Sequence, residues 1–296
     1  MLKEQFIARI KQVRRVLWVT MALNLLVAGL KLAYGHWSES LSMLADGFHS
    51  LLDSSSNVVG LVAISLAAKP PDQGHPYGHR KIEALGAILI SFLLFWACYE
   101  IATSAWERYR HPGVIPEVTV WSFLIMLGTM VVNYFVSQYE HRKGHELSSQ
   151  ILTADSAHTR SDVYASISVI ISLIAVKLHW PWVDLPAAIV IVFFIGHSGF
   201  RIVLEALNTL MDSAQLDNRQ VSEIVMGVDG IRKCHNIRTR GNPSAVYMDL
   251  NIHVDPDLPT KDAHKLTHQV ISSIKKAIPQ VVDVVVHTEP NTPKHE

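Results

Sequence analysis

The sequence predicts a helical membrane domain followed by a smaller domain of mixed helix and strand. Three observations lead to this fold class. Apolar residues dominate the first two-thirds of the 296-residue chain, whereas charged residues concentrate at the N-terminus, in two loops and after about residue 210. Stretches of roughly 20 apolar residues, the length that crosses a bilayer as a helix, recur in the apolar part. The part of the chain after about residue 210 alternates between helical and strand patterns of apolar residues.

Six segments are candidates for transmembrane helices, and they cover residues 16–34, 39–67, 82–106, 118–139, 154–178 and 181–210. Two of them, 39–67 and 154–178, are weak by hydropathy because they carry several polar and ionisable side chains. Lipid cannot face such polar surfaces. We therefore expect these two helices to be buried against each other or to line a water-filled cavity.

Basic residues are distributed unevenly between the loops on the two sides of the membrane. If the N-terminus is cytoplasmic, the inner segments 3–15, 69–81 and 142–143 carry ten Lys and Arg residues, whereas the outer loops carry Arg108, Arg110 and Lys177. Inner loops are usually the basic ones. We therefore expect a multi-pass protein of the inner (plasma) membrane with both termini in the cytoplasm and the lipid bilayer as its surroundings.

Residues 213–290 predict a cytoplasmic domain with the element order αββαβ, which resembles a ferredoxin-like fold. The expected elements are a helix over 218–226, strands over 233–240 and 246–254, a helix over 260–277 and a strand over 281–287. Gly241 to Ser244 form a turn signal between the first two strands, and Thr260 is an expected N-cap. The domains are thus 1–212 and 213–290, with a tail over 291–296.

Composition limits the partners. The formal net charge is zero, so nothing favours a nucleic acid as a partner. The two cysteines, Cys98 and Cys234, predict neither a disulfide framework nor a cysteine-based zinc module. Sixteen histidines are a large share for this length and raise the expectation of metal chemistry.

Two His-x-x-x-Asp steps, His49 to Asp53 and His158 to Asp162, are the most informative motifs of the chain. Residues i and i+4 share one face of a helix, so each step presents an imidazole beside a carboxylate. Two such faces opposed would offer two nitrogen and two oxygen ligands, which suits tetrahedral zinc. Because both steps lie in apolar helices, we interpret them as one metal site in the membrane.

Two further groups of ligand-type residues are present. Asp72, His75 and His79 lie in a Pro- and Gly-rich loop, where they either converge on one ion or hydrogen-bond to the backbone. The C-terminal domain carries a larger group, in which any single member is better explained by a core or interface role, although together they favour a metal-binding surface. Its members are His235, His253, His264, His268, His287 and Glu289.

These motifs resemble the cation diffusion facilitator family, dimeric antiporters that exchange zinc for protons. The resemblance covers nearly the whole chain and depends on residues 42–45, the His-Pro-Tyr-Gly-His loop within 72–81, residues 154–162 and the αββαβ tail. It implies that His49, Asp53, His158 and Asp162 form the transport site.

The resemblance also assigns roles outside the transport site. It implies that Asp72, His75 and His79 form a second site. It further implies a binuclear cytoplasmic site, for which His268 could replace His264, and in which Glu289 stands where the family often has Asp. Lys81 and Asp212 would pair as a lock between the helices of a homodimer. The members of the binuclear site would be His235, His253, His264, His287 and Glu289.

The expected function is therefore the export of zinc from the cytoplasm in exchange for protons, by alternating access. Cadmium and cobalt suit the same nitrogen-containing site, which disfavours manganese, and ferrous iron is the alternative cargo. A metal-gated channel or a membrane metal sensor would use similar ligands without coupling to protons. The chain lacks a His-Glu-x-x-His motif and a nucleophile elbow, so we do not expect an enzyme.

Overall fold

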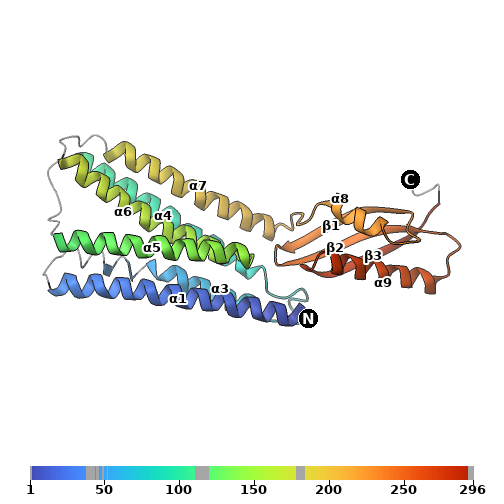
Figure 1. Ribbon diagram of the computed structural model, residues 1–296. Coiled ribbons are helices and arrows are strands. Elements are labelled where there is room, and N and C mark those ends of the chain that lie inside the picture. Colours follow the sequence, from blue (N-terminus) through green and yellow to red (C-terminus); the bar gives the residue numbers. More distant parts are fainter. Residues whose placement is uncertain are drawn as a thin grey trace. The chain divides into compact units, whose positions relative to one another are not determined.

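The computed structural model describes residues 2–37, 44, 47–48, 50–51, 53–110, 120–177 and 184–292. The chain divides into two compact units, residues 3–206 and 207–296 (Figure 1). Each unit is described by itself below.

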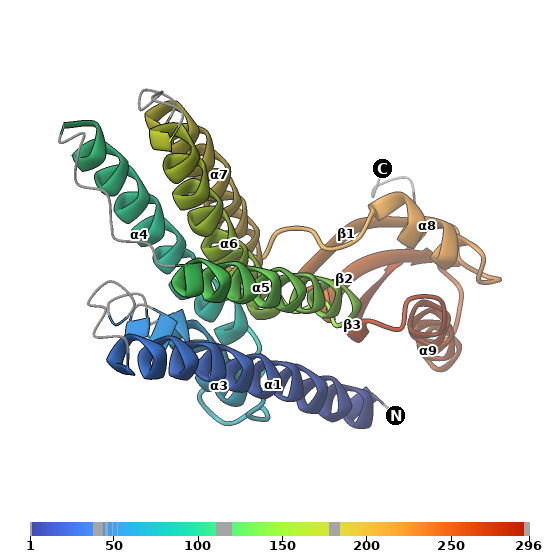
Figure 2. The same cartoon turned by 60° about the vertical axis from the view of Figure 1, so that its left-hand side comes forward.

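The regular elements described in the first unit are all helices. Its helices are α1 (Leu2–Trp37), α3 (Ser55–Ala67), α4 (Ile82–Arg110), α5 (Val120–Glu146), α6 (Gln150–Lys177) and α7 (Asp184–Leu210). Both views show α1 beside α3 and α6 beside α7 (Figures 1 and 2). Each predicted span overlaps a described helix, which for 39–67 is α3 at its end, and residues 118–119, 178 and 181–183 of the other spans lie outside the described residues. The remainder of the span 39–67, residues 53–54 and isolated positions aside, also lies outside the described residues.

Three stretches of the described chain are long and apolar enough to cross a membrane, and they are Phe6–Trp37, Ile82–Glu107 and Leu185–Leu210. Large apolar side chains such as Phe92 and Trp96 on α4 and Phe193 and Phe194 on α7 are exposed. A soluble surface rarely carries so much apolar area. These faces suit contact with lipid.

Helix α6 is less apolar, and its polar half is buried. Asp155, His158, Thr159 and Ser161 are all at most 5% exposed. This agrees with the expectation that the polar segment 154–178 is shielded from lipid. The interior of the helical unit is thus polar around the N-terminal half of α6.

Helices α5 and α6 form a tight antiparallel hairpin. Ser148 adopts a left-handed conformation with φ of 47° in the turn, and the Ser149 amide donates to the Gly144 carbonyl at 2.8 Å. A side chain at Gly144 would lie 2.9 Å from Thr153 Oγ1, so glycine permits the close approach. Buried Glu83 of α4 is hydrogen-bonded by Arg9 of α1 and by Ser149, which ties α1 and α4 to this turn.

The second unit is a three-stranded sheet with two helices. Its elements are α8 (Asn218–Met226), β1 (Lys233–Asn242), β2 (Ala245–Val254), α9 (Thr260–Ala277) and β3 (Val281–Pro290). The strand order is β1-β2-β3, with β1 antiparallel and β3 parallel to β2. The predicted αββαβ order is therefore confirmed. Thr260 was expected to be the N-cap of α9, which is wrong: the cap is Pro259, whose extended φ and ψ precede the first helical residue.

The two faces of the sheet differ. Met248, Leu250 and Ile252 of β2 join the apolar core with Val221 of α8 and Ile274 of α9. Successive residues of a strand point to opposite faces. The odd-numbered residues of β2 consequently lie on the face away from the core.

Candidate metal centres

Asp53, His158 and Asp162 converge inside the helical unit, and we call them the membrane cluster. One ligand atom of each lies within 4.8 Å of those of the other two. Nε2 of His158 is 4.0 Å from Oδ1 of Asp53. A distance of this size is too long for a direct hydrogen bond and leaves room for an ion between the groups. His49, the fourth predicted ligand, lies outside the described residues.

The geometry of α6 explains how the membrane cluster forms. His158 and Asp162 are one turn apart and therefore share a face of the helix. His158 is 5% exposed, whereas the two carboxylates are half-buried. One imidazole and two carboxylates in a largely apolar surrounding form a donor set that binds divalent cations and leaves a fourth position free.

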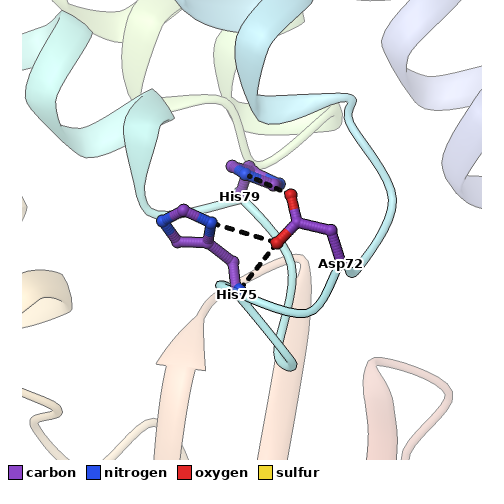
Figure 3. A group of neighbouring side chains, drawn as sticks. All are labelled: Asp72, His75 and His79. Carbon is purple, nitrogen blue, oxygen red and sulfur yellow. Dashed lines mark hydrogen bonds and ion pairs between the residues drawn. The ribbon is translucent and has the colours of Figure 1, made fainter.

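Asp72, His75 and His79 converge in the loop between α3 and α4, and we call them the loop cluster (Figure 3). The two imidazoles flank one carboxylate: Nδ1 of His75 is 3.2 Å from Oδ1 of Asp72, and Nε2 of His79 is 3.4 Å from Oδ2. Gly78 has φ of 81°, which glycine adopts without strain and which turns the chain back toward α4. Both rings contact the carboxylate of Asp72, and the same atoms could hold an ion.

Asp72 and His75 of the loop cluster are exposed, and a backbone amide donates to the Asp72 carboxylate. The amide of His75 donates to Oδ1 of Asp72 at 2.7 Å. This hydrogen bond holds the pKa of Asp72 below its ordinary value, aided by the nearby His75 and His79 rings. The carboxylate is thus ionised at any physiological pH and available to a cation.

His235, His253 and Glu289 converge on the sheet face away from the core, and we call them the sheet cluster. His253 lies opposite Glu289 in the β2–β3 pairing, and His235 lies opposite Asn251 in the β1–β2 pairing. Nε2 of His253 is 3.1 Å and Nε2 of His235 is 3.5 Å from Oε2 of Glu289. The register of the three strands therefore places the cluster.

Buried nitrogens in the sheet cluster fit a metal. His253 is 2% exposed. Its Nε2 lies close to Glu289, but among the described residues neither ring nitrogen has a partner at angles that suit a hydrogen bond. Nδ1 of His235 is also buried without a partner. Buried polar atoms are nearly always satisfied, so an ion held by these nitrogens and Glu289 would account for them.

The remaining predicted members of the cytoplasmic site lie apart from this group or at its edge. Nε2 of His287 is 3.6 Å from Oε1 of Glu289, but its side chain is 67% exposed. His264 and His268 pair with each other on α9, with 3.1 Å between their Nε2 atoms. The two rings lie against each other, so either His264 or His268 could be the member of the cytoplasmic site.

Two family models divide the chain in the same way as its architecture. The cation efflux transmembrane domain matches residues 17–211, and the cytoplasmic domain of cation efflux proteins matches residues 214–291. The chain belongs to the cation diffusion facilitator family. It is a divalent metal cation efflux transporter of the membrane and not an enzyme.

Curated relatives match along most of their length. An uncharacterized transporter of Methanocaldococcus jannaschii is 28% identical, with 94% of this chain and 99% of the relative covered. The manganese efflux system protein MneS of Bacillus subtilis is 27% identical, covering 92% and 93%. The cation-efflux pump FieF of Shewanella oneidensis is 26% identical, covering 92% and 91%. One of these relatives is named for manganese efflux, so membership of the family does not by itself define which metal is transported.

The transporter also contains buried residues that sequence reasoning did not assign. Glu140 of α5 and Asp155 of α6 are fully buried, and Asn57 of α3 donates to Asp155. A carboxylate three residues before His158, on the same helical face, was a signal that could have found Asp155. Glu140 gave no such signal, because only the α5–α6 hairpin brings it to α6.

Proposed function

We propose that this transporter exports zinc from the cytoplasm in exchange for protons, as a homodimer, with His49, Asp53, His158 and Asp162 as its transport site. The observation that carries the proposal is the convergence of Asp53, His158 and Asp162 in the interior of the helical unit. Ionisable groups at such a depth are costly and usually serve the ion path. The carboxylates supply charge, and the imidazole supplies selectivity.

Zinc is favoured by the donor types. An imidazole nitrogen in the ligand set suits zinc, cadmium and cobalt, whereas carboxylate-only sets suit manganese. Ferrous iron is the alternative cargo, because nitrogen and oxygen ligands together bind it as well. Manganese, the cargo named for MneS, would require a site in which the histidines contribute little.

Proton exchange follows from the chemistry of the ligands. Metal binds neutral imidazole and ionised carboxylate, so protons and metal compete for the same site. An ordinary imidazole titrates near pH 6.5, within the range of cellular pH gradients. Inward proton flow can then drive metal outward when the site alternates between the two sides.

Dimerisation and regulation belong to the same proposal. The match to a cytoplasmic domain of the dimerising type supports a homodimer, in which the loop cluster, the sheet cluster, His264 and His287 bind regulatory metal. Lys81 precedes α4 and Asp212 follows α7, and we propose that they form the lock between the helices. The basic inner loops support cytoplasmic termini in the plasma membrane.

Flux measurements test the proposal. Purified protein in liposomes with a pH-sensitive dye inside is given zinc, cadmium, cobalt, ferrous iron and manganese in turn. We expect zinc flux accompanied by opposite proton flux, and a weak response to manganese. Metal flux without any change of internal pH would refute the exchange, and manganese flux exceeding zinc flux would refute the assignment of cargo.

A further inference from the structure

A second group of polar side chains is buried in the helical unit beside the membrane cluster. Glu140 and Asp155 are both 0% exposed. Asp155 precedes His158 by three residues, which places it about one turn, roughly 5 Å, nearer to the α5–α6 turn. We call Glu140 and Asp155 the carboxyl pair.

Neutral donors satisfy one oxygen of each carboxyl group. Nδ2 of Asn57 donates to Oδ2 of Asp155 at 2.5 Å, and Oγ1 of Thr159 donates to Oε2 of Glu140 at 3.1 Å. Nδ2 of Asn24 donates to Oδ1 of Asn57, which fixes the orientation of the Asn57 amide. Helices α1, α3, α5 and α6 all contribute to this arrangement, so it is built by the fold.

The other oxygen of each group has no donor. Oε1 of Glu140 and Oδ1 of Asp155 are buried and have no hydrogen-bond partner among the described residues when both groups are counted as carboxylates. The hydroxyl of Thr159, which donates to Oε2 of Glu140, lies 3.2 Å from the backbone carbonyl of Asp155, so the two carboxyl groups lie at the same turn of α6 and interact with each other. A hydrogen bond between two carboxyl groups requires a proton on one of them.

Among the described residues, Asp155 and the hydroxyl groups of Thr20 and Thr159 act on Glu140. Asp155 interacts in addition with the hydroxyl of Ser56 and with His158, a member of the membrane cluster. Asp53, also of that cluster, lies one turn before Asn57. Two ionised carboxylates in contact would be very unfavourable in such a place.

We propose that Glu140 and Asp155 share one proton and form the binding site of the counter-ion, an inference that rests on the proton exchange proposed above. The proton lies between Oε1 of Glu140 and Oδ1 of Asp155, so the pair carries one negative charge. When a divalent cation binds to the membrane cluster, the proton leaves to water and the pair becomes doubly negative. Metal binding raises the charge of the membrane cluster by two, and this favours loss of the proton from the neighbouring pair, which couples the two ions without requiring them to share ligands.

Infrared spectroscopy of the full-length protein tests the shared proton without any transport. The metal-free protein should show the C=O stretching band of a buried protonated carboxylic acid, which shifts to lower frequency in D2O and is lost on adding zinc. Glu140→Gln and Asp155→Asn should each remove this band. The matched control is Glu146→Gln at the exposed end of α5, where Glu146 pairs with Arg142 and Lys143, and it should leave the band unchanged.

The counter-ion role is tested in liposomes. Glu140→Gln should reduce the number of protons moved per zinc ion by one relative to the wild type and Glu146→Gln. A wild-type protein without the band, or a band that persists in both variants of the pair, would overturn the shared proton. An unchanged proton count in Glu140→Gln would overturn the counter-ion role. A wild-type protein with the band but no proton flux would refute the proposed exchange and leave the shared proton standing.

Discussion

Individual histidines of this transporter differ in burial, and burial decides what each can do. His253 is 2% exposed, and its ring nitrogens lack well-formed hydrogen bonds, whereas the side chain of His287 is 67% exposed. Both occupy strands and both neighbour Glu289. A ligand whose ring is already held by packing loses less entropy on binding metal. His253 should therefore contribute more to affinity than His287.

The carboxylates of the membrane cluster should be essential for transport. Asp53→Ala and Asp162→Ala each remove a charged ligand, and both should reduce zinc flux in liposomes to background while the helical content stays near that of the wild type. Asp257→Ala, an exposed position in the second unit, is the control and should transport normally. Normal flux in either membrane-cluster variant would remove that residue from the site.

Glu289 should give the sheet cluster a characteristic dependence on pH. Burial alone would raise the pKa of this carboxyl, but the hydrogen bond from Asn251 and the neighbouring His235, His253 and His287 lower it below the ordinary value of 4.5. A group whose pKa is lower in the folded state stabilises the fold above its unfolded pKa, and this stability is lost as pH falls through the folded pKa. The contribution should therefore be complete at pH 6 and disappear below pH 4.5.

The measurement compares the wild-type domain, residues 213–296, with Glu289→Gln in the absence of metal. The melting temperature of the variant should be lower at pH 6, and the difference should shrink as pH falls. A difference that stays constant down to pH 3 would show that the ionisation of Glu289 contributes nothing to stability.

At the scale of helices, close crossings hold the first unit together. A Cβ atom at Gly86 of α4 would lie 2.5 Å from Cβ of Ala63 in α3, so the two helices touch at this point. At Gly128 of α5, by contrast, no atom of the described residues lies within 4 Å of such a Cβ. The same substitution at the two glycines therefore separates packing from helix propensity.

Gly86→Ala should destabilise the transporter, whereas Gly128→Ala should be neutral or slightly stabilising. Overpacking a tight contact costs about 1–3 kcal/mol, and alanine gains about 1 kcal/mol of helix propensity over glycine. Thermal unfolding in detergent, followed by the loss of monodisperse protein, measures the difference. Equal stability of the two variants would contradict the close crossing of α3 and α4.

Some elements could be predicted from sequence because their signals are local. The Pro- and Gly-rich loop ending before Ile82 defined the start of α4, and alternation of apolar and polar residues defined β2. The cap of α9 was misplaced because Thr260 has a suitable side chain, yet Pro259 occupies the capping position with its fixed φ. The approach of Glu140 to Asp155 depends on hairpin geometry, which no local pattern contains.

At the scale of the whole molecule, each unit has its own apolar core, so metal binding to the second unit can be measured separately. Residues 213–296 should dimerise and gain thermal stability with zinc, because a ligand that binds only the folded state stabilises it by about 2.7 kcal/mol at 100 times its Kd. The triple change of His235, His253 and His287 to Ala should abolish this gain. A domain that binds no zinc by calorimetry at micromolar concentration would contradict a regulatory site.

The most direct test of the transport site is an equilibrium zinc titration of the full-length protein in which the other sites have been removed. Alanine replaces His75 and His79 in the loop cluster, His235 and His253 in the sheet cluster, and His264 and His268 on α9. One zinc ion per protomer should still bind, and adding Asp162→Asn should weaken it by at least about tenfold, since even residues that only orient ligands contribute that much. No residual zinc binding, or residual binding that Asp162→Asn leaves unchanged, would contradict a metal site at Asp53, His158 and Asp162.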